Sequence, residues 1–115
     1  MTGAKEIIHT AMIKLGGVTS GIHRFGGTEY KLGKREIGHV HGNHLVDIPF
    51  PLKVRNELVE NGEAEPHHIL PESGWVSVYL KNETDIDNAI NLLKLSYQIA
   101  SEKISSKENH PEKYL

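Results

Sequence analysis

Three histidines that could bind one metal ion, His39, His41 and His44, lie close together in the chain. Because side chains alternate along a β-strand, His39 and His41 would share one face of a strand, together with Ile37. The glycine–asparagine pair between His41 and His44 is typical of a two-residue hairpin turn, which would bring His44 beside His41. Zinc and related ions take imidazole nitrogens at about 2.0–2.1 Å. The spacing therefore predicts a divalent-metal site formed by His39, His41 and His44.

Four further residues could take part in the chemistry of this hairpin, namely Asp47, Glu65, His67 and His68. If the connector around His67 folds over the sheet, any of them could complete a metal site, and three ligands with an open position would be of the catalytic type. His67 or His68 could instead be an acid–base catalyst paired with Glu65 or Glu72. The alternative is that the histidines pack in half-buried strands and bond to carbonyls or carboxylates, since no established metal spacing such as H-E-x-x-H occurs.

A small-molecule ligand is predicted to contact Arg24, His39, His41 and Trp75. Arg24 lies in a glycine-rich segment that could present its guanidinium and backbone amides to an anion. Trp75 begins an aromatic and β-branched stretch and is predicted to lie in the core or beside the ligand. The sequence contains neither G-x-x-x-x-G-K-[ST] nor G-x-G-x-x-G, so no nucleotide cofactor is expected.

The composition limits the classes of function. With 13 basic and 15 acidic residues among 115, the chain has a net charge of -2, which argues against nucleic-acid binding. It contains no cysteine, which excludes disulfides, thiolate metal sites and thiol nucleophiles. The N-terminus has no basic segment followed by an apolar one, and the apolar runs are too short to cross a bilayer. A cytoplasmic protein without a membrane span is therefore expected.

The pattern of apolar residues predicts seven elements in the order α-β-β-β-α-β-α. Helical spacing indicates helices over residues 4–15, from Pro51 up to Gly62, and over 84–104, the last with Thr84 and Asp87 as a capping box. Alternation and turn signals indicate strands over residues 28–32, 36–41, 44–48 and 75–80. We expect one α+β domain over residues 1–104, with a frayed charged tail over 105–115. Its sheet would be a three-stranded antiparallel meander plus one further strand, with one face left partly open.

Several motifs resemble the small bacterial and fungal proteins of the luciferase domain family. The resemblance covers residues 18–100 and rests on motifs that occur in order: His23-Arg24-Phe25-Gly26-Gly27, Leu32-Gly33-Lys34-Arg35-Glu36-Ile37-Gly38-His39-Val40-His41-Gly42, Asp47-Ile48-Pro49-Phe50-Pro51, Glu65-Pro66-His67-His68-Ile69-Leu70-Pro71, Ser73-Gly74-Trp75-Val76-Ser77, and Leu92-Leu93 with Leu95-Ser96-Tyr97. The resemblance brings no catalytic residues and no mechanism with it. The aromatic strand and the Asp-rich start of the last helix also look like the YjbR/MmcQ domains, which implies a frataxin-like fold.

Three hypotheses of function follow. The first is a module that binds a small molecule or a protein on the open sheet face around the histidine-rich hairpin. The second is an enzyme that uses a divalent metal or histidine acid–base catalysis. The third is a homodimeric structural or interaction protein, or a weak DNA binder.

Overall fold

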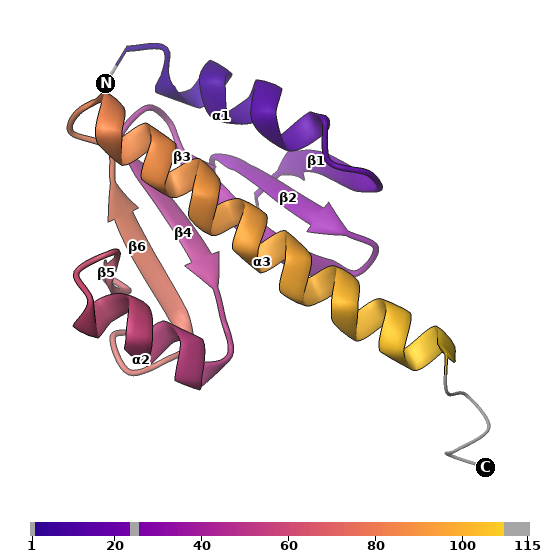
Figure 1. Cartoon of the computed structure of the whole chain (residues 1–115). Helices are drawn as coiled ribbons and strands as arrows, with labels where there is room; N and C mark the ends of the chain where they lie inside the picture. The colour runs from indigo at the N-terminus through magenta and orange to yellow at the C-terminus, as the bar shows by residue number, and fades with distance from the viewer. Residues whose placement is uncertain (1, 24–25, 110–115) are drawn as a thin grey trace.

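A computed structural model describes residues 2–23 and 26–109 (Figure 1). Within these residues six strands form one antiparallel sheet, in the order β1-β2-β3-β4-β6-β5, and three helices accompany it. The elements are α1 (Ala4–Ile13), β1 (Val18–Ile22), β2 (Thr28–Leu32), β3 (Arg35–His41), β4 (Leu45–Pro49), α2 (Leu52–Glu60), β5 (Glu65–Pro66), β6 (Trp75–Tyr79) and α3 (Glu83–Asn109).

The predicted α+β class is confirmed, and the sheet is larger than expected. β1 adds a fourth strand to the predicted meander by pairing with β2, and β5 adds a short edge strand beside β6. Neither shows the alternation of a half-buried strand, because β1 is mostly exposed and β5 has only two residues. Edge strands of this kind carry little apolar signal in the sequence.

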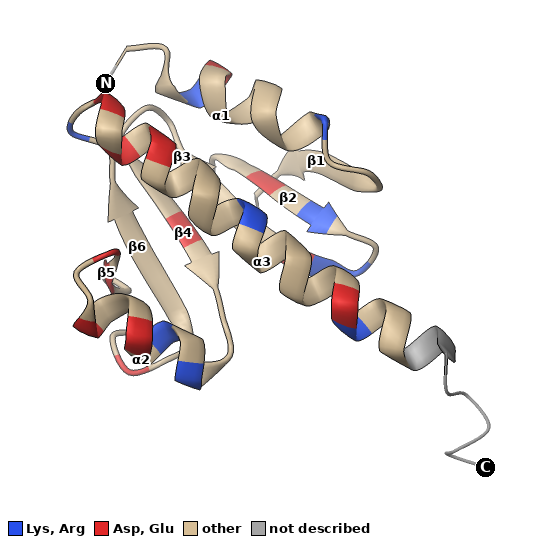
Figure 2. Cartoon of the chain, in the orientation of Figure 1, with Lys and Arg blue, Asp and Glu red and all other residues tan. Residues whose placement is uncertain are grey.

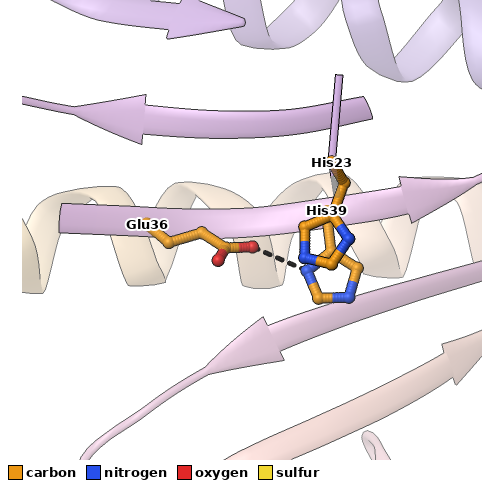
Figure 3. A group of neighbouring side chains, drawn as sticks. All are labelled: His23, Glu36 and His39. Atoms are coloured by element: carbon orange, nitrogen blue, oxygen red, sulfur yellow. Dashed lines mark hydrogen bonds and ion pairs between the residues drawn. The ribbon is translucent and has the colours of Figure 1, made fainter. Parts of the chain in front are cut away.

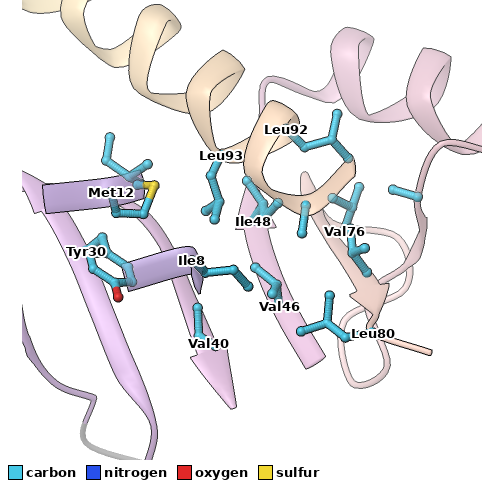
Figure 4. Packing of buried hydrophobic residues seen from close by; sticks show 14 of the residues in the cluster. Ile8, Met12, Tyr30, Val40, Val46, Ile48, Val76, Leu80, Leu92 and Leu93 are labelled. Carbon is cyan, nitrogen blue, oxygen red and sulfur yellow. The ribbon is translucent and has the colours of Figure 1, made fainter. Parts of the chain in front are cut away.

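One face of the sheet is covered by α1 and α3, and the hydrophobic core lies between them and the strands (Figures 1 and 4). Ile8 and Met12 of α1, Leu93 of α3, and Val46 and Ile48 of β4 are all completely buried and belong to one cluster. Burial of each such side chain stabilises the fold by about 1.5–3 kcal/mol. α2 packs near β5 and β6 at one end of the sheet. The opposite face, which α1 and α3 do not cover, carries the side chains of His39 and His41.

The last helix begins one residue earlier and extends further than the sequence indicated. Its reciprocal cap is formed by Asn82 and Asp85, not by Thr84 and Asp87: the Asn82 side chain accepts from the Asp85 N–H, and the Asp85 carboxylate accepts from the Asn82 N–H. α3 runs to Asn109, so residues 105–109, which were predicted to belong to a frayed tail, are helical. Residues 110–115 of that tail lie outside the described residues.

None of the helices within 2–23 and 26–109 is long and apolar enough to span a membrane.

A β-bulge in β3 sets which side chains reach the open face. Tyr30 pairs with Gly38, whereas the next residue, Lys31, pairs with Glu36, so Ile37 is one extra residue on β3. Ile37 is fully buried in the core and does not share the face of His39 and His41, contrary to the expectation from simple alternation. Instead Glu36 reaches His39. A bulge re-aims the residues on one side of it, and Ser96 of α3 holds this one by donating to the Ile37 carbonyl at 2.9 Å.

We expect Gly74→Ala to destabilise the protein by about 1–3 kcal/mol, because a Cβ there would be overpacked. An ideal Cβ at Gly74 would lie 2.2 Å from the carbonyl oxygen of Phe50, in a segment where the Phe50 N–H donates to the Gly74 carbonyl. Gly21→Ala is the matched control, since a Cβ at Gly21 meets nothing within 4 Å, and it should change stability by less than about 0.5 kcal/mol. Urea denaturation measures the free energy of unfolding of both variants. Equal values for the two would contradict the close approach of the Phe50 carbonyl to Gly74.

Candidate metal-binding site

The candidate site is built around Asp47, the only charged residue of β4, on which Figure 2 shows a single red segment. Its side chain is 1% exposed, and it pairs across the sheet with His39 on one side and Ser77 on the other. Oδ1 accepts a hydrogen bond from Ser77 Oγ at 2.7 Å. Oδ2 faces the Nε2 atoms of four histidines, at 3.2 Å (His39), 3.0 Å (His41), 3.4 Å (His67) and 3.1 Å (His68).

Four imidazole nitrogens are more than one carboxylate oxygen can satisfy as hydrogen-bond donors. A carboxylate offers about four lone-pair directions over its two oxygens, and Ser77 already uses one at Oδ1. Atoms bound to one tetrahedral ion at about 2.0–2.1 Å lie about 3.3 Å from one another. The separations around Asp47 Oδ2 are therefore those of metal ligands as well as those of hydrogen bonds.

His39 is oriented by Glu36, whose carboxylate lies 2.6 Å from His39 Nδ1 (Figure 3). With Nδ1 bound to Glu36, Nε2 points to Asp47. Burial of the ring alone would lower the pKa of His39, but the hydrogen bonds to Asp47 and Glu36 and their charges raise it to about 9. The ring of His23 stacks on His39 with centroids 4.1 Å apart, and Trp75 lies 5.2 Å away on centroids.

The pKa of the Asp47 carboxyl is held well below its usual range. Burial alone would raise this pKa, but the hydrogen bonds from His39, Ser77 and His68 outweigh it. Asp47 is therefore an anion at neutral pH, which is the form that binds a cation.

His67 is held in the tautomer that donates from Nε2. Its Nδ1 accepts hydrogen bonds from the backbone N–H groups of Ile69 and Leu70, at 3.1 and 3.0 Å, so in the neutral ring the proton is on Nε2. Burial is the largest cause of its lowered pKa, which favours this neutral form. His67 thus offers an N–H, not a lone pair, to the centre of the site.

The residues best placed to hold an ion are His39, His41 and Asp47, whose ligand atoms lie within 4.8 Å of one another. Asp47 also forms such a group with His67 and His68, but there His67 presents its proton. In a third group of His23, Glu36 and His39, the 2.6 Å contact between Glu36 and His39 is too short to place an ion between those two atoms. Glu36 instead orients His39, as carboxylates commonly do for metal-bound histidines.

These side chains line a cavity of about 670 Å³ on the open face of the sheet. Trp75 forms part of its wall, and further residues come from β1, β2, the β2–β3 turn and the connector between β5 and β6. Together they are Ile22, His23, Glu29, Lys31, Lys34, Glu36, His39, His41, Asp47, His67, His68, Ile69, Leu70 and Trp75.

The structure brings some of the predicted site residues together and leaves others apart. The 670 Å³ cavity on the open face is lined by five of them, namely His39, His41, His67, His68 and Trp75. Arg24, predicted to contact a ligand, lies outside the described residues.

His44 and Glu65 are both exposed, and neither lines the cavity. His41 pairs with Leu45, so the hairpin loop contains three residues and includes His44, where a two-residue turn was expected. That shift of one residue removes His44 from the strand, and with it the convergence on His41. Glu65 is in the edge strand β5, paired with Ser77.

Three residues of the site were not predicted as a group with the hairpin, namely His23, Glu36 and Ser77. Glu36 reaches His39 because of the bulge at Ile37, which the alternation of the sequence does not reveal. Ser77 meets Asp47 because β6 pairs with β4 across the α2 crossover. An aspartate in an otherwise apolar strand was the signal available for Asp47, since a buried carboxylate requires partners.

A comparison with known protein families supports the resemblance seen in the motifs. A family model described as "Luciferase domain" matches residues 34–96, a range that contains the hairpin, Asp47, His67, His68 and Trp75. Neither a curated protein nor a solved structure matches the chain significantly, and the likeness to the YjbR/MmcQ domains is not shown. Because the family match covers more than half of the 115 residues, the chain belongs to the Luciferase domain family.

Proposed function

We propose that this protein binds a divalent transition-metal ion through His39, His41 and Asp47 and accepts a small-molecule ligand in the cavity beside it. The observation that carries the proposal is the convergence of several imidazole nitrogens on one buried carboxylate oxygen. Two histidines and a carboxylate suit zinc, iron and related ions. This combines the binding-module and metal hypotheses at one site.

The surroundings of these three residues support an open site. Glu36 fixes the orientation of His39 from the far side of the ring, and Ser77 fixes Asp47 through its other oxygen. Three protein ligands leave coordination positions free, as in catalytic metal sites and unlike closed structural ones. A bound ion of this type would polarise an oxygen atom of a ligand in the cavity.

The test is metal analysis of protein prepared without a polyhistidine tag, followed by calorimetric titration with zinc. We expect one ion per chain, and at least about a thousandfold loss of affinity in the His39→Ala/His41→Ala variant, since both nitrogen ligands are removed. His44→Ala is the matched control, because His44 is an exposed histidine of the same hairpin, and it should bind zinc as the unmodified chain does. Absence of zinc binding, or equal losses in both variants, would refute the site.

His67→Asn is expected to change zinc affinity by less than about tenfold, because His67 presents a proton to the site. An asparagine side-chain oxygen can accept from the N–H groups two and three residues ahead, as His67 Nδ1 does, so the connector should keep its conformation. The same zinc titration measures the effect. A loss as large as that of the His39→Ala/His41→Ala variant would show that His67 is itself a ligand.

A further inference from the structure

Two lysines line the cavity that contains the proposed metal ligands. They are Lys31, from β2, and Lys34, from the turn before β3. Lys31 forms an ion pair with Glu29 at 3.3 Å, and among the described residues Lys34 has no ion-pair partner. The acidic groups at the bottom are engaged, since Glu36 and Asp47 both bond to histidines. With a divalent ion bound, the cavity would carry a net positive charge and would favour an anion.

The same cavity has an apolar rim. Ile22 is 89% exposed, Ile69 71% and Leu70 51%, and all three line this cavity together with Trp75. Ile22 ends β1, whereas Ile69 and Leu70 belong to the connector after β5, so the apolar side chains come from both edges of the sheet with the histidines between them. Large apolar side chains left in water around a polar centre are typical of a ligand-binding site.

We propose that the site binds a monocarboxylic acid with an extended apolar body. The carboxylate binds the metal ion in an open coordination position, and the apolar body lies against Ile69, Leu70 and Trp75. This inference rests on the proposed metal site and names the class of its ligand. The volume of about 670 Å³ falls within the 300–1,000 Å³ that is usual for small-molecule sites. A flat protein or membrane surface would contact the rim but would not reach Asp47, which is 1% exposed.

The test is a calorimetric titration of the zinc-loaded protein with acetate, butyrate, hexanoate and octanoate, each below its micelle concentration. We expect the affinity to rise by about twofold to fourfold for each added methylene, as burial of a methylene implies. Octylammonium, which has the same chain and the opposite charge, should show no binding. In the His39→Ala/His41→Ala variant, which lacks the metal ligands, octanoate should bind at least about tenfold more weakly.

Two variants separate the apolar rim from the metal. Ile69→Ala/Leu70→Ala should weaken octanoate binding by about tenfold or more and leave both acetate and zinc binding unchanged. Leu52→Ala is the matched control, since Leu52 is an exposed apolar residue on α2 away from this cavity. It should leave the binding of octanoate, acetate and zinc unchanged.

The outcomes distinguish failure of the ligand from failure of the metal site. If zinc binds but affinity is the same for acetate and octanoate, or octylammonium binds as tightly as octanoate, the carboxylic-acid proposal is wrong and the metal site stands. If octanoate binds the unmodified chain and the His39→Ala/His41→Ala variant equally tightly, the proposal that its carboxylate coordinates the metal ion is wrong. If zinc does not bind at all, both proposals are overturned.

Discussion

Asp47→Asn is expected to destabilise the metal-free protein by about 3–5 kcal/mol, the cost of removing one partner from a buried ion pair. Asp47 is 1% exposed, and the His39 side chain beside it is 9% exposed. An asparagine would leave the protonated His39 ring with Glu36 as its only anionic partner. It would also direct an amide N–H₂ at groups that already donate, either Ser77 or the histidines. Because domains are stabilised by only about 5–15 kcal/mol in total, this single change would remove a large fraction of the stability.

Urea denaturation at pH 7 in the presence of a chelator measures this effect. Asp87→Asn is the matched control, since Asp87 is an exposed aspartate of α3, and it should change the free energy of unfolding by less than about 0.5 kcal/mol. The Asp47 variant should also bind zinc far more weakly, because an amide oxygen is a neutral and poorer ligand than a carboxylate. If Asp47→Asn were as stable as the Asp87 control, the buried carboxylate would not be the centre of the site.

The metal-free protein is expected to lose stability on the alkaline side, on the order of 3 kcal/mol between pH 6.5 and pH 9. The pKa of His39 is raised from 6.5 to about 9 in the folded protein, and each unit of difference corresponds to about 1.4 kcal/mol. A base with a raised pKa binds its proton more tightly when folded. Its contribution is therefore complete below pH 6.5 and is lost as the pH rises through about 9.

Below pH 6.5 the free energy of unfolding is expected to change in the opposite direction, falling as the pH falls. The pKa of His67 is lowered by its burial, so its protonation opposes folding and stability should fall as the pH drops below 6.5. The lowered pKa of Asp47 contributes stability at neutral pH that is lost only in stronger acid. Stability should therefore be greatest near pH 6.5–7.

Unfolding in urea at half-unit steps from pH 5 to pH 9, with chelator present, measures this profile. The His39→Gln variant removes the titrating ring, and its stability should no longer fall as the pH rises from 6.5 to 9, whatever its absolute value. A profile of the unmodified chain that is flat above pH 6.5 would contradict the hydrogen-bonded, protonated state of His39.

The sequence by itself determined the class of fold and the neighbourhood of the site. The spacing of Ile8 and Met12 predicts a helix with one buried face, and the stretch that begins at Trp75 predicts a strand, because each element must bury one side. The pair His39 and His41 on one face followed from the two-residue period of a strand. These are local properties of the chain, and the structure confirms the α+β class that they indicate.

Only the tertiary structure decided which residues meet at Asp47. One extra residue at Ile37 brings Glu36 to His39, and one extra residue in the hairpin loop takes His44 away from His41. Local patterns do not record such shifts, because a change of one residue reverses the face on which every following side chain lies. His67 and His68 reach Asp47 across 20 and 21 positions of sequence, through the pairing of β6 with β4. Pairing between distant strands depends on how the whole sheet packs, and that packing turns a histidine-rich hairpin into a candidate metal site.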